Sequence, residues 1–498
     1  MICGDTLDKK VDWSIMCYAT TVASRRKIIK MLYKRKSAAE SAAYRPKKDL
    51  TQGPLLPRLL LYCLPLMLTG MLQLFYNATD LIVVGQFSSP TAVGAVGACG
   101  SLIGLLVNAF IGLSVGVSVT VAQHVGAKED KDASEVVHTS LALAIGLGLV
   151  VGAFGFFFAE GALRLMDTPE TTIAEAAPYA KAYMLGIPAS MVYNYCAAAL
   201  RAKGDTVRPL VFLGLSGLAN VGLNLYFVIC HGMGAVGVGI ATTVAQYIAM
   251  VMILVYMTFS VKDCTRIHWG QVRVHKQKLL RILRIGLPAG AQSVVFSFSN
   301  VLIQSTVNTF GENVINGNAA AASIDGFIYT AQNSVYQAAI TFVGQHVGAR
   351  KFERINRVIF LCMGLVTAIG LGVAGLVVLF SHGLLNIYVP GDEAAIAWGT
   401  QRLRVMGACY FTCGLMEVGC GALRGMGKTI TPMLISIVGV CGIRILWIYT
   451  IFPLDPTMMC LYFSYPASWI VTGAIQLTLA FISKRRLVRR EMLRYEVY

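Results

Sequence analysis

Twelve mostly apolar stretches follow one another along the chain, and they limit its fold more than any other feature. Each is long enough to cross the hydrocarbon core of a bilayer, which takes about 20 residues of helix. Backbone polar groups in lipid must be bonded within the protein, so spans of this kind are helices. The predicted spans are residues 58–84, 92–122, 138–159, 179–200, 209–230, 236–260, 283–310, 318–345, 358–380, 402–422, 432–452 and 458–482.

Composition excludes a soluble enzyme carrying a single membrane anchor. Only 13% of the 498 residues are charged and 56% are hydrophobic, whereas soluble domains average about 25% charged. The net charge of +17 would suggest nucleic acid in a soluble protein. In a membrane protein it reflects orientation instead, so we expect no nucleic-acid partner. The 13 cysteines contain no C-x-x-C pair, and we expect neither a structural metal nor a cofactor.

The positive charges alternate between the two sides of the predicted membrane. All but five of the 42 lysines and arginines fall in the tails or in every second break between spans. Loops rich in lysine and arginine stay in the cytoplasm. The pattern therefore predicts an even number of spans, with both termini cytoplasmic.

The second half of the chain repeats the first. Three pairs of matching segments occur in the same order, 222 or 223 residues apart. Because six spans are an even number, both halves insert in the same orientation. We predict an all-α membrane protein of two six-helix bundles, related by a pseudo-two-fold axis along the membrane normal. The matching pairs are VAQHVGAK 121–128 with VGQHVGAR 343–350, ALRAKGDTVRP 199–209 with ALRGMGKTITP 422–432, and Leu64-Pro65 with Leu287-Pro288.

The duplication also sets the predicted domain boundaries. Two helical bundles are joined by a cytoplasmic linker and flanked by basic tails. The predicted parts are a cytoplasmic N-terminal tail (1–55, for which a start codon assigned too early is the alternative), an N-terminal bundle (56–262), a linker (263–280), a C-terminal bundle (281–483) and a basic cytoplasmic tail (484–498). Two such bundles suit alternating access, in which they rock about a shared cavity.

The segments LPLMLTGMLQLFYNATDLIVVGQF, VAQHVGAKE, ALRAKGDTVRP and NVGLNLYFVICHGMGAVGVGIATT resemble the multidrug and toxic compound extrusion (MATE) family, in particular its prokaryotic DinF-like branch. VGQHVGAR and ALRGMGKTITPM extend the resemblance to the second half. It runs from about residue 54 to residue 483. It implies a multidrug antiporter of the bacterial cytoplasmic membrane that exports organic cations.

Asp80 is a carboxylate inside the first predicted span. Such a group costs about 2.5–3.5 kcal/mol on insertion scales. Removal from water favours the protonated form of a carboxyl, and a nearby cation favours the charged form. Asp80 can therefore exchange a proton for a cation, although a structural hydrogen-bond acceptor is the alternative. The resemblance implies an essential acidic residue at this position, where Na⁺ is a second candidate ion.

Three polar residues on the fifth and sixth spans are the expected partners of Asp80. Asn220 and Asn224 are one helical turn apart, so they share a face, and Thr242 follows on the next span. The resemblance implies a proton pocket of Asp, Asn, Asp and Thr in this half. Asn224 departs from it, because many relatives have a second carboxylate there. Interhelical hydrogen bonding is the alternative role of the two asparagines.

The second half carries different polar residues. Ile303 aligns with Asp80, so the two bundles are chemically unequal. Span seven lacks the glutamate with which some family members bind sodium. The candidates in this bundle are Asp325, which could simply be wet near the outer mouth, and Glu417 with Arg444. The last two could form a buried ion pair, although their depths differ by roughly 9 Å.

Aromatic side chains in the spans could bind organic cations through their ring faces, at about 0.5–2 kcal/mol each. Ordinary packing is the alternative for each of them. The candidates for the cavity are Tyr76, Tyr193, Phe298 and Tyr329.

We therefore expect a monomeric secondary antiporter, not an enzyme, that exports small organic cations in exchange for protons or sodium. A lipid-linked saccharide flippase of the same superfamily is the first alternative. It would need several cationic residues in its cavity, and the first-half cavity is expected to contain none. A non-transporting receptor or channel is the second alternative.

Overall fold

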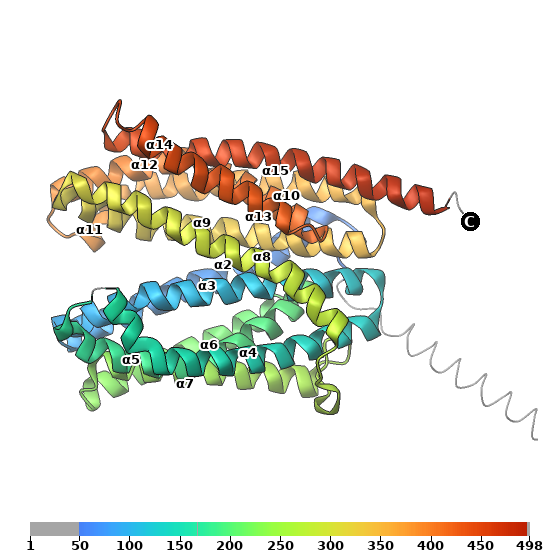
Figure 1. Ribbon diagram of the computed structural model, residues 1–498, viewed down its shortest axis with the longest axis horizontal. Helices are drawn as coiled ribbons and strands as arrows, with labels where there is room; N and C mark the ends of the chain where they lie inside the picture. The colour runs from blue at the N-terminus through green and yellow to red at the C-terminus, as the bar shows by residue number, and fades with distance from the viewer. Residues whose placement is uncertain (1–48, 167, 496–498) are drawn as a thin grey trace, which may run out of the picture. The chain divides into compact units, whose positions relative to one another are not determined.

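The computed structural model describes residues 49–166 and 168–495, and all regular structure in these ranges is helical. Helices α2–α15 form one compact unit, in which two bundles lie beside each other (Figure 1). The predicted N-terminal tail falls almost entirely outside the described residues. The prediction of an all-α fold with two six-helix bundles is confirmed.

The N-terminal bundle consists of six long helices. Two of them end in a π-helical turn, marked η. The bounds are α2 Leu55–Phe87, α3 Pro90–Ala127, α4 Asp130–Leu165, α5 Glu170–Lys203, α6 Val207–Leu225 continued by η1 Tyr226–Cys230, and α7 Gly234–Val255 continued by η2 Tyr256–Ser260. A short turn of 3₁₀ helix, η3 Trp269–Gln271, lies in the connection to the second bundle.

The C-terminal bundle repeats this order, with one additional short helix, α11. The eleventh span of the chain, which lies in this bundle, is divided by a π-helical segment, η5. The bounds are α8 Lys276–Val307 with η4 Asn308–Phe310, α9 Glu312–Gly348, α10 Phe352–Leu379, α11 Ser381–Tyr388, α12 Glu393–Gly425, α13 Ile430–Ser436, η5 Ile437–Gly442, α14 Ile443–Thr450 and α15 Met458–Tyr495.

Ten helices in the described residues are long and apolar enough to cross a membrane. The remaining two predicted spans are α5 and α9, which have 34 and 37 residues but a more polar sequence. Their many buried positions explain that polarity, because their side chains contact neighbouring helices more than lipid.

The duplicated motifs adopt the same backbone conformation in both halves. Lys128 and Arg350, which are equivalent in the repeat, are the two non-glycine residues with positive φ in the described part of the chain, at 60° and 55°. Gly204 and Gly427 are also equivalent, and both have positive φ. Such left-handed residues end helices. The repeated motifs therefore end helices in the same way in both halves of the chain.

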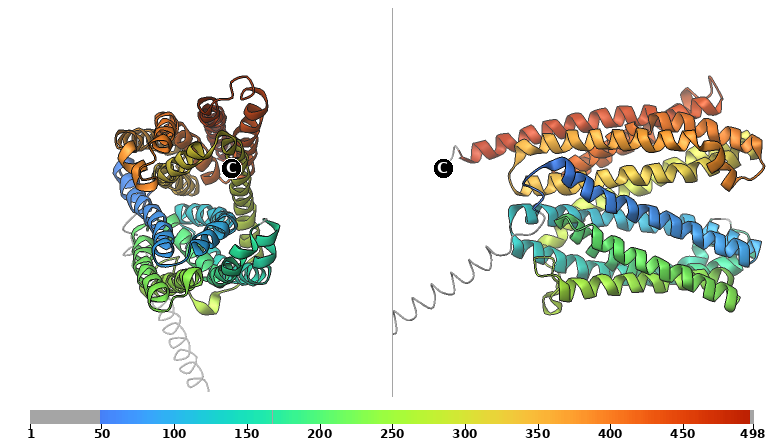
Figure 2. Two further views of the ribbon diagram at one scale, coloured as in Figure 1. Left: turned by 90° about the vertical axis from the view of Figure 1, so that its left-hand side faces the viewer. Right: turned by 180° about the vertical axis from the view of Figure 1, so that it is seen from behind.

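The first helix of each half packs partly against the other bundle. Leu59, Tyr62 and Cys63 of α2 belong to a core cluster with Phe342 of α9. In the other direction, Ile282 of α8 joins the core of the N-terminal bundle. Figure 2 shows the same two bundles from the side and from behind. Each half therefore packs its first helix against the other half, and these two contacts hold the bundles together.

Both ends of the described chain lie at the same end of the bundles. Lys351 and Arg354, at the start of α10, donate to the backbone carbonyl of Thr51, which precedes α2. Arg350 forms an ion pair with Glu491 near the end of α15, with a distance of 2.7 Å. This arrangement agrees with an even number of spans.

Candidate functional site

Two glutamines link the bundles at the end where α3, α5, α9 and α12 finish. Gln123 of α3 donates its side-chain amide to the carbonyl of Gly425 at 2.9 Å. Gln345 of α9 donates to the carbonyl of Ala202 at 2.7 Å. Gln123 and Gln345 are equivalent in the repeat, and so are Ala202 and Gly425. We call this end, defined by the two glutamine bonds, the closed end.

Glycines let the backbones of α3 and α9 approach each other at the closed end. A side chain on Gly126 would collide with the backbone of Gln345, and one on Gly348 would collide with the backbone of Gln123. Gly126 and Gly348 are also equivalent in the repeat. The two VGA motifs therefore form a symmetric contact between the bundles, which only glycine permits at this separation.

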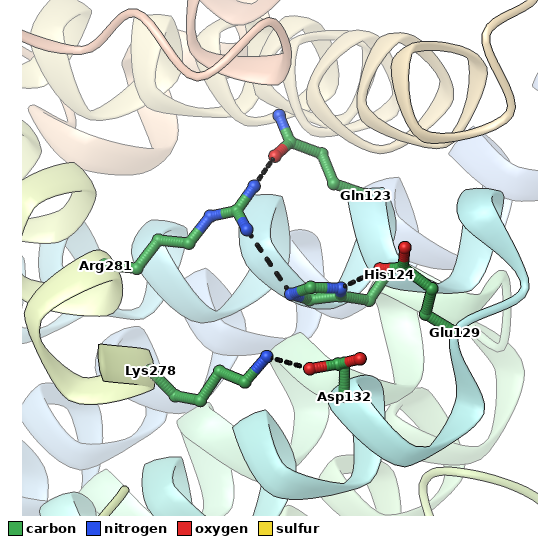
Figure 3. Close-up of polar contacts among 6 residues, drawn as sticks. All are labelled: Gln123, His124, Glu129, Asp132, Lys278 and Arg281. Carbon is green, nitrogen blue, oxygen red and sulfur yellow. Dashed lines mark hydrogen bonds and ion pairs between the residues drawn. The ribbon is translucent and has the colours of Figure 1, made fainter. Parts of the chain in front are cut away.

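Charged side chains reinforce the closed end on one side (Figure 3). Arg281 of α8 donates to Gln123 Oε1 at 2.5 Å, and its guanidinium also reaches His124 Nε2 at 3.4 Å. His124 Nδ1 contacts Glu129 at 2.7 Å, and Lys278 forms an ion pair with Asp132. These contacts tie the start of the C-terminal bundle to the end of α3 and the start of α4.

His124, Glu129 and Asp132 present donor atoms close enough together for one metal ion. Lys278 and Arg281 already face these atoms. Arg281 occupies His124 Nε2 and Lys278 occupies the Asp132 carboxylate, so these atoms are not free to bind a metal ion. The cluster therefore acts as an ion-pair network. His346, the repeat equivalent of His124, contacts the carbonyl of Phe342 in its own helix.

A central cavity of about 380 Å³ lies between the bundles. Its walls come from both halves, namely α2, α3 and α5 on one side and α8, α9 and α12 on the other. A volume of this size suits a drug-sized molecule. The ionisable residues in its lining other than tyrosines are Arg201, Glu417 and Arg424.

A second cavity of about 260 Å³ lies within the N-terminal bundle and contains Asp80, Asn220 and Thr242 in its lining. It adjoins the central cavity, because the two share five lining residues. The shared residues are Gln73, Asn77, Ile111, Tyr193 and Asn194. Asp80 is therefore placed next to the space between the bundles.

The four residues expected in the N-terminal pocket form one hydrogen-bond network. Asn224 Nδ2 donates to Asp80 Oδ1 at 2.5 Å and to Asn220 Oδ1 at 3.3 Å. Thr242 Oγ1 donates to Asp80 Oδ2 at 3.4 Å, and Asn220 donates to Thr242 Oγ1 at 3.2 Å. In the described part of the chain, the carboxylate of Asp80 has no cationic partner at ion-pair distance. Its hydrogen-bond donors are neutral.

Asp325 is not wet, contrary to the expectation for it. Its side chain lies in the C-terminal bundle at 3% exposure. Arg402 of α12 donates to Asp325 Oδ2 through Nε at 3.1 Å and also hydrogen-bonds Asn318. Arg402 lies just inside its predicted span, where a buried arginine needs a counter-ion. The pair explains how both charges are tolerated.

The ion pair considered between Glu417 and Arg444 is not formed. Arg444 donates to Ser468 at 3.2 Å and to Asn300 at 3.3 Å. Its guanidinium also lies 4.2 Å from the ring centroid of Tyr465. Glu417 lines the central cavity instead. The difference in depth between the two residues explains why they stay apart.

Three of the four candidate aromatic residues line a cavity. Tyr76 lines the N-terminal cavity, Tyr193 lines both cavities, and Tyr329 lines the central one. Phe298 is 71% exposed and belongs to the lining of neither. Its neighbour Phe296, two residues earlier on α8, takes the place expected for Phe298.

Arg201 and Arg424 were missed as residues of the central cavity. The cavity that contains Asp80 has no lysine or arginine in its lining, as expected. Both arginines lie at the ends of predicted spans, where charge normally faces water. The signal that could have revealed them is their equivalence in the motifs ALRAKGD and ALRGMGK, since a repeated arginine at a helix end has a repeated environment.

Two bundles of six membrane-length helices, joined at one end and enclosing a polar cavity, define the class of multi-pass membrane transporters. A family model described as MatE matches the chain twice, over residues 65–228 and 288–450. The chain belongs to the MatE family, whose members are transporters and not enzymes. The two matches coincide with the two halves of the duplication.

Curated relatives agree with this assignment. The chain is 27% identical over 397 residues to the probable multidrug resistance protein YpnP of Bacillus subtilis, covering 80% of this chain and 88% of that protein. It is 26% identical over 402 residues to the multidrug resistance protein PmpM of Pseudomonas aeruginosa, covering 78% and 82%.

Solved structures share the fold at low sequence identity. A MOP superfamily transporter from Pyrococcus furiosus superposes with a TM-score of 0.82 at 20% identity, covering 88% of this chain and 98% of that one. An outward-facing multidrug resistance MATE family transporter gives 0.82 at 20% identity, covering 89% and 98%.

Proposed function

We propose that this transporter exports small organic cations in exchange for protons and that Asp80 binds the proton. The observation that carries the proposal is the environment of the Asp80 carboxylate. It contacts the neutral donors Asn224 and Thr242 and lies in a cavity next to the central one. Such a carboxylate can gain or lose a proton without breaking an ion pair.

The coupling follows from competition for one charge. When the central cavity opens to one side, water and a cationic substrate stabilise the charged carboxylate. When the cavity is dry and empty, burial favours the protonated carboxyl. Proton and cation therefore bind in different states, which is the requirement for antiport. The aromatic rings of Tyr193 and Tyr329 supply further surface for a cation.

Sodium is the second candidate for the coupling ion at Asp80. The side-chain oxygens of Asp80, Asn220 and Thr242 belong to one connected network, and oxygen ligands suit a hard cation. Proton coupling remains our first proposal, because Asn224 and Thr242 direct hydrogen-bond donors, not oxygen ligands, at the Asp80 carboxylate.

The proposed orientation in the membrane follows from the distribution of basic residues, and the proposed oligomeric state follows from the cavity. We place both termini and the closed end in the cytoplasm of a bacterial cell, in the cytoplasmic membrane, because the basic loops gather there. On this orientation the conformation described is sealed toward the cytoplasm by Gln123 and Gln345. We propose a monomer as the functional unit, since each chain contains a complete cavity.

The test is efflux of ethidium from proteoliposomes, with pH and sodium gradients imposed separately. The pH gradient should drive efflux by the natural protein, and Asp80→Asn should abolish it while the protein still purifies as a folded species. Asp455→Asn is the matched control, because Asp455 is exposed in the loop before α15. Efflux by Asp80→Asn at the natural rate would remove Asp80 from the mechanism. Efflux driven by sodium alone would replace the proton.

A lipid-linked saccharide flippase is the second candidate function. The specific observation in its favour is the pair of arginines, Arg201 and Arg424, in the central cavity. The cavity volume of about 380 Å³ favours a drug-sized substrate over a lipid-linked saccharide.

A further inference from the structure

Arg201 and Arg424 occupy equivalent positions of the two repeats, and both line the central cavity. Each is near the end of its helix, α5 or α12, beside the backbone carbonyls that accept the glutamine bonds of the closed end. The two bundles therefore each contribute one arginine to the part of the cavity next to the closed end. We call this part the cavity floor.

Arg424 is held in place by neutral groups. Its side chain is 5% exposed. One terminal nitrogen donates to the hydroxyl of Tyr336, and the other donates to Gln292 Oε1 at 2.8 Å. Its Nε is buried without a hydrogen-bond partner in the described part of the chain. Its charge is thus oriented by hydrogen bonds but is not neutralised by a paired carboxylate.

Arg201 has fewer contacts still. Its Nε is also buried without a hydrogen-bond partner among the described residues. The hydroxyl of Tyr62 donates to the backbone carbonyl of Arg201 at 3.1 Å. Nothing in the described part of the chain forms an ion pair with the guanidinium.

Arg424 is buried and Arg201 is half-buried, and neither has a paired carboxylate among the described residues. Such charges are costly in a membrane protein, where ionisable residues normally pair or mark a substrate path. Arginine presents several donors in a fixed plane that matches a carboxylate. We propose that the cavity floor binds the anionic group of the substrate and that the protein transports zwitterionic amphiphiles that carry a carboxylate. The proposal rests on transport through the central cavity but not on proton coupling at Asp80.

The position of Glu417 supports a zwitterion over a simple anion. Glu417 precedes Arg424 by seven residues on α12, so both lie on the same face, about 10 Å apart along the helix axis. Both line the same cavity. A substrate with its carboxylate at the floor would place a cationic group near Glu417, farther from the closed end. Tyr329 lies in the same lining and offers an aromatic surface to the cationic group.

A matched pair of dyes tests the proposal. Rhodamine 110 carries a free carboxylate, and rhodamine 123 is its methyl ester, a simple cation with the same ring system. Binding of both is measured by fluorescence polarisation to the purified full chain in phosphatidylcholine nanodiscs, which contain no anionic lipid headgroup. Arg201→Gln and Arg424→Gln should each lower the ratio of acid affinity to ester affinity about tenfold or more. Arg424→Lys should restore part of the ratio.

Two further variants separate this proposal from the others. Arg444→Gln removes a buried arginine outside the lining of the central cavity and should leave the ratio unchanged. In an Asp80→Asn background, which should abolish pH-driven efflux, Arg424→Gln should still lower the ratio, so failure of the coupling proposal is distinguished from failure of this one. An unchanged ratio in both cavity variants, with folding confirmed by thermal denaturation, would overturn the proposal.

Discussion

Asn224 donates its side-chain amide to Asp80 Oδ1 over 2.5 Å, between helices α6 and α2. The resemblance to the family had suggested a second carboxylate at position 224. An amide there leaves one titratable group in the pocket and gives it a fixed neutral donor. Our predictions of stoichiometry and voltage dependence rest on this one contact.

The first prediction concerns voltage. Exchange of one proton for one monovalent cation moves no net charge, so ethidium efflux should depend on the pH gradient alone, at about 1.4 kcal/mol per pH unit. Asn224→Asp adds a second carboxylate and should allow two protons per cation, which moves one net charge across the membrane. Ethidium efflux by that variant should therefore respond to voltage, with about 2.3 kcal/mol of driving force per 100 mV. Potassium–valinomycin potentials at fixed pH provide the measurement. A strong voltage response by the natural protein would reject one-proton coupling.

The second prediction concerns the buried ion pair between Asp325 and Arg402. Removal of either partner leaves an uncompensated charge, which costs about 3–5 kcal/mol. Asp325→Asn and Arg402→Gln should each lower the melting temperature in detergent markedly, and the double variant should be more stable than the sum of the two effects predicts. Strict additivity in this double-mutant cycle would show that the two side chains do not stabilise each other.

The third prediction concerns the closed end. Gln123→Ala and Gln345→Ala each remove one cross-bundle hydrogen bond, worth about 1 kcal/mol net. Each should shift the population toward opening at that end by about fivefold, and by similar amounts because the two bonds are equivalent in the repeat. Spin-label distances across the closed end provide the measurement. Gln271→Ala, at the exposed end of η3, is the control. A large shift in only one of the two variants would contradict the symmetric arrangement.

The fourth prediction concerns orientation and uses two cysteines as single reporters in a cysteine-free background. Cys230 is exposed at the connection between α6 and α7, and Cys264 lies in the connection between the bundles. A membrane-impermeant maleimide should label Cys230 in intact cells. Labelling of Cys230 from the cytoplasmic side only would reverse the predicted topology.

The reactivity of Cys264 should also depend on pH. Burial, together with the nearby charge of Asp130, raises the pKa of Cys264 to about 11. Because the thiolate is the reactive form, a raised pKa means that Cys264 still gains reactivity about tenfold per pH unit between pH 8 and pH 10. An ordinary thiol levels off in this range. Labelling rates in permeabilised cells provide the measurement, and a plateau of the Cys264 rate near pH 9 would contradict the shift.

Hydropathy and the repeat were sufficient to predict the helical bundles, because the bilayer permits few alternatives for apolar runs of this length. The partners of Asp80 could be proposed because Asn220 and Asn224 are one turn apart on a helix, and the structure places both in its network. The role of these residues remains a prediction.

The charges of the second bundle could not be paired from the sequence. Asp325 and Arg402 are 77 residues apart, and only the packing of α9 against α12 brings them together. Arg201 and Arg424 resemble ordinary basic residues at helix ends until the cavity between the bundles is known. In both cases the missing information is which helix faces lie opposite each other, which hydrophobic periodicity alone does not specify.

Proton movement driven by the substrate tests the central claim most directly. Proteoliposomes loaded with tetraethylammonium and the pH dye pyranine are diluted into substrate-free buffer, with the membrane potential clamped at zero. We predict that the lumen acidifies by close to one proton per cation released and that Asp80→Asn shows no acidification. Cation release without acidification by the natural protein, or equal acidification by Asp80→Asn, would contradict proton exchange at Asp80.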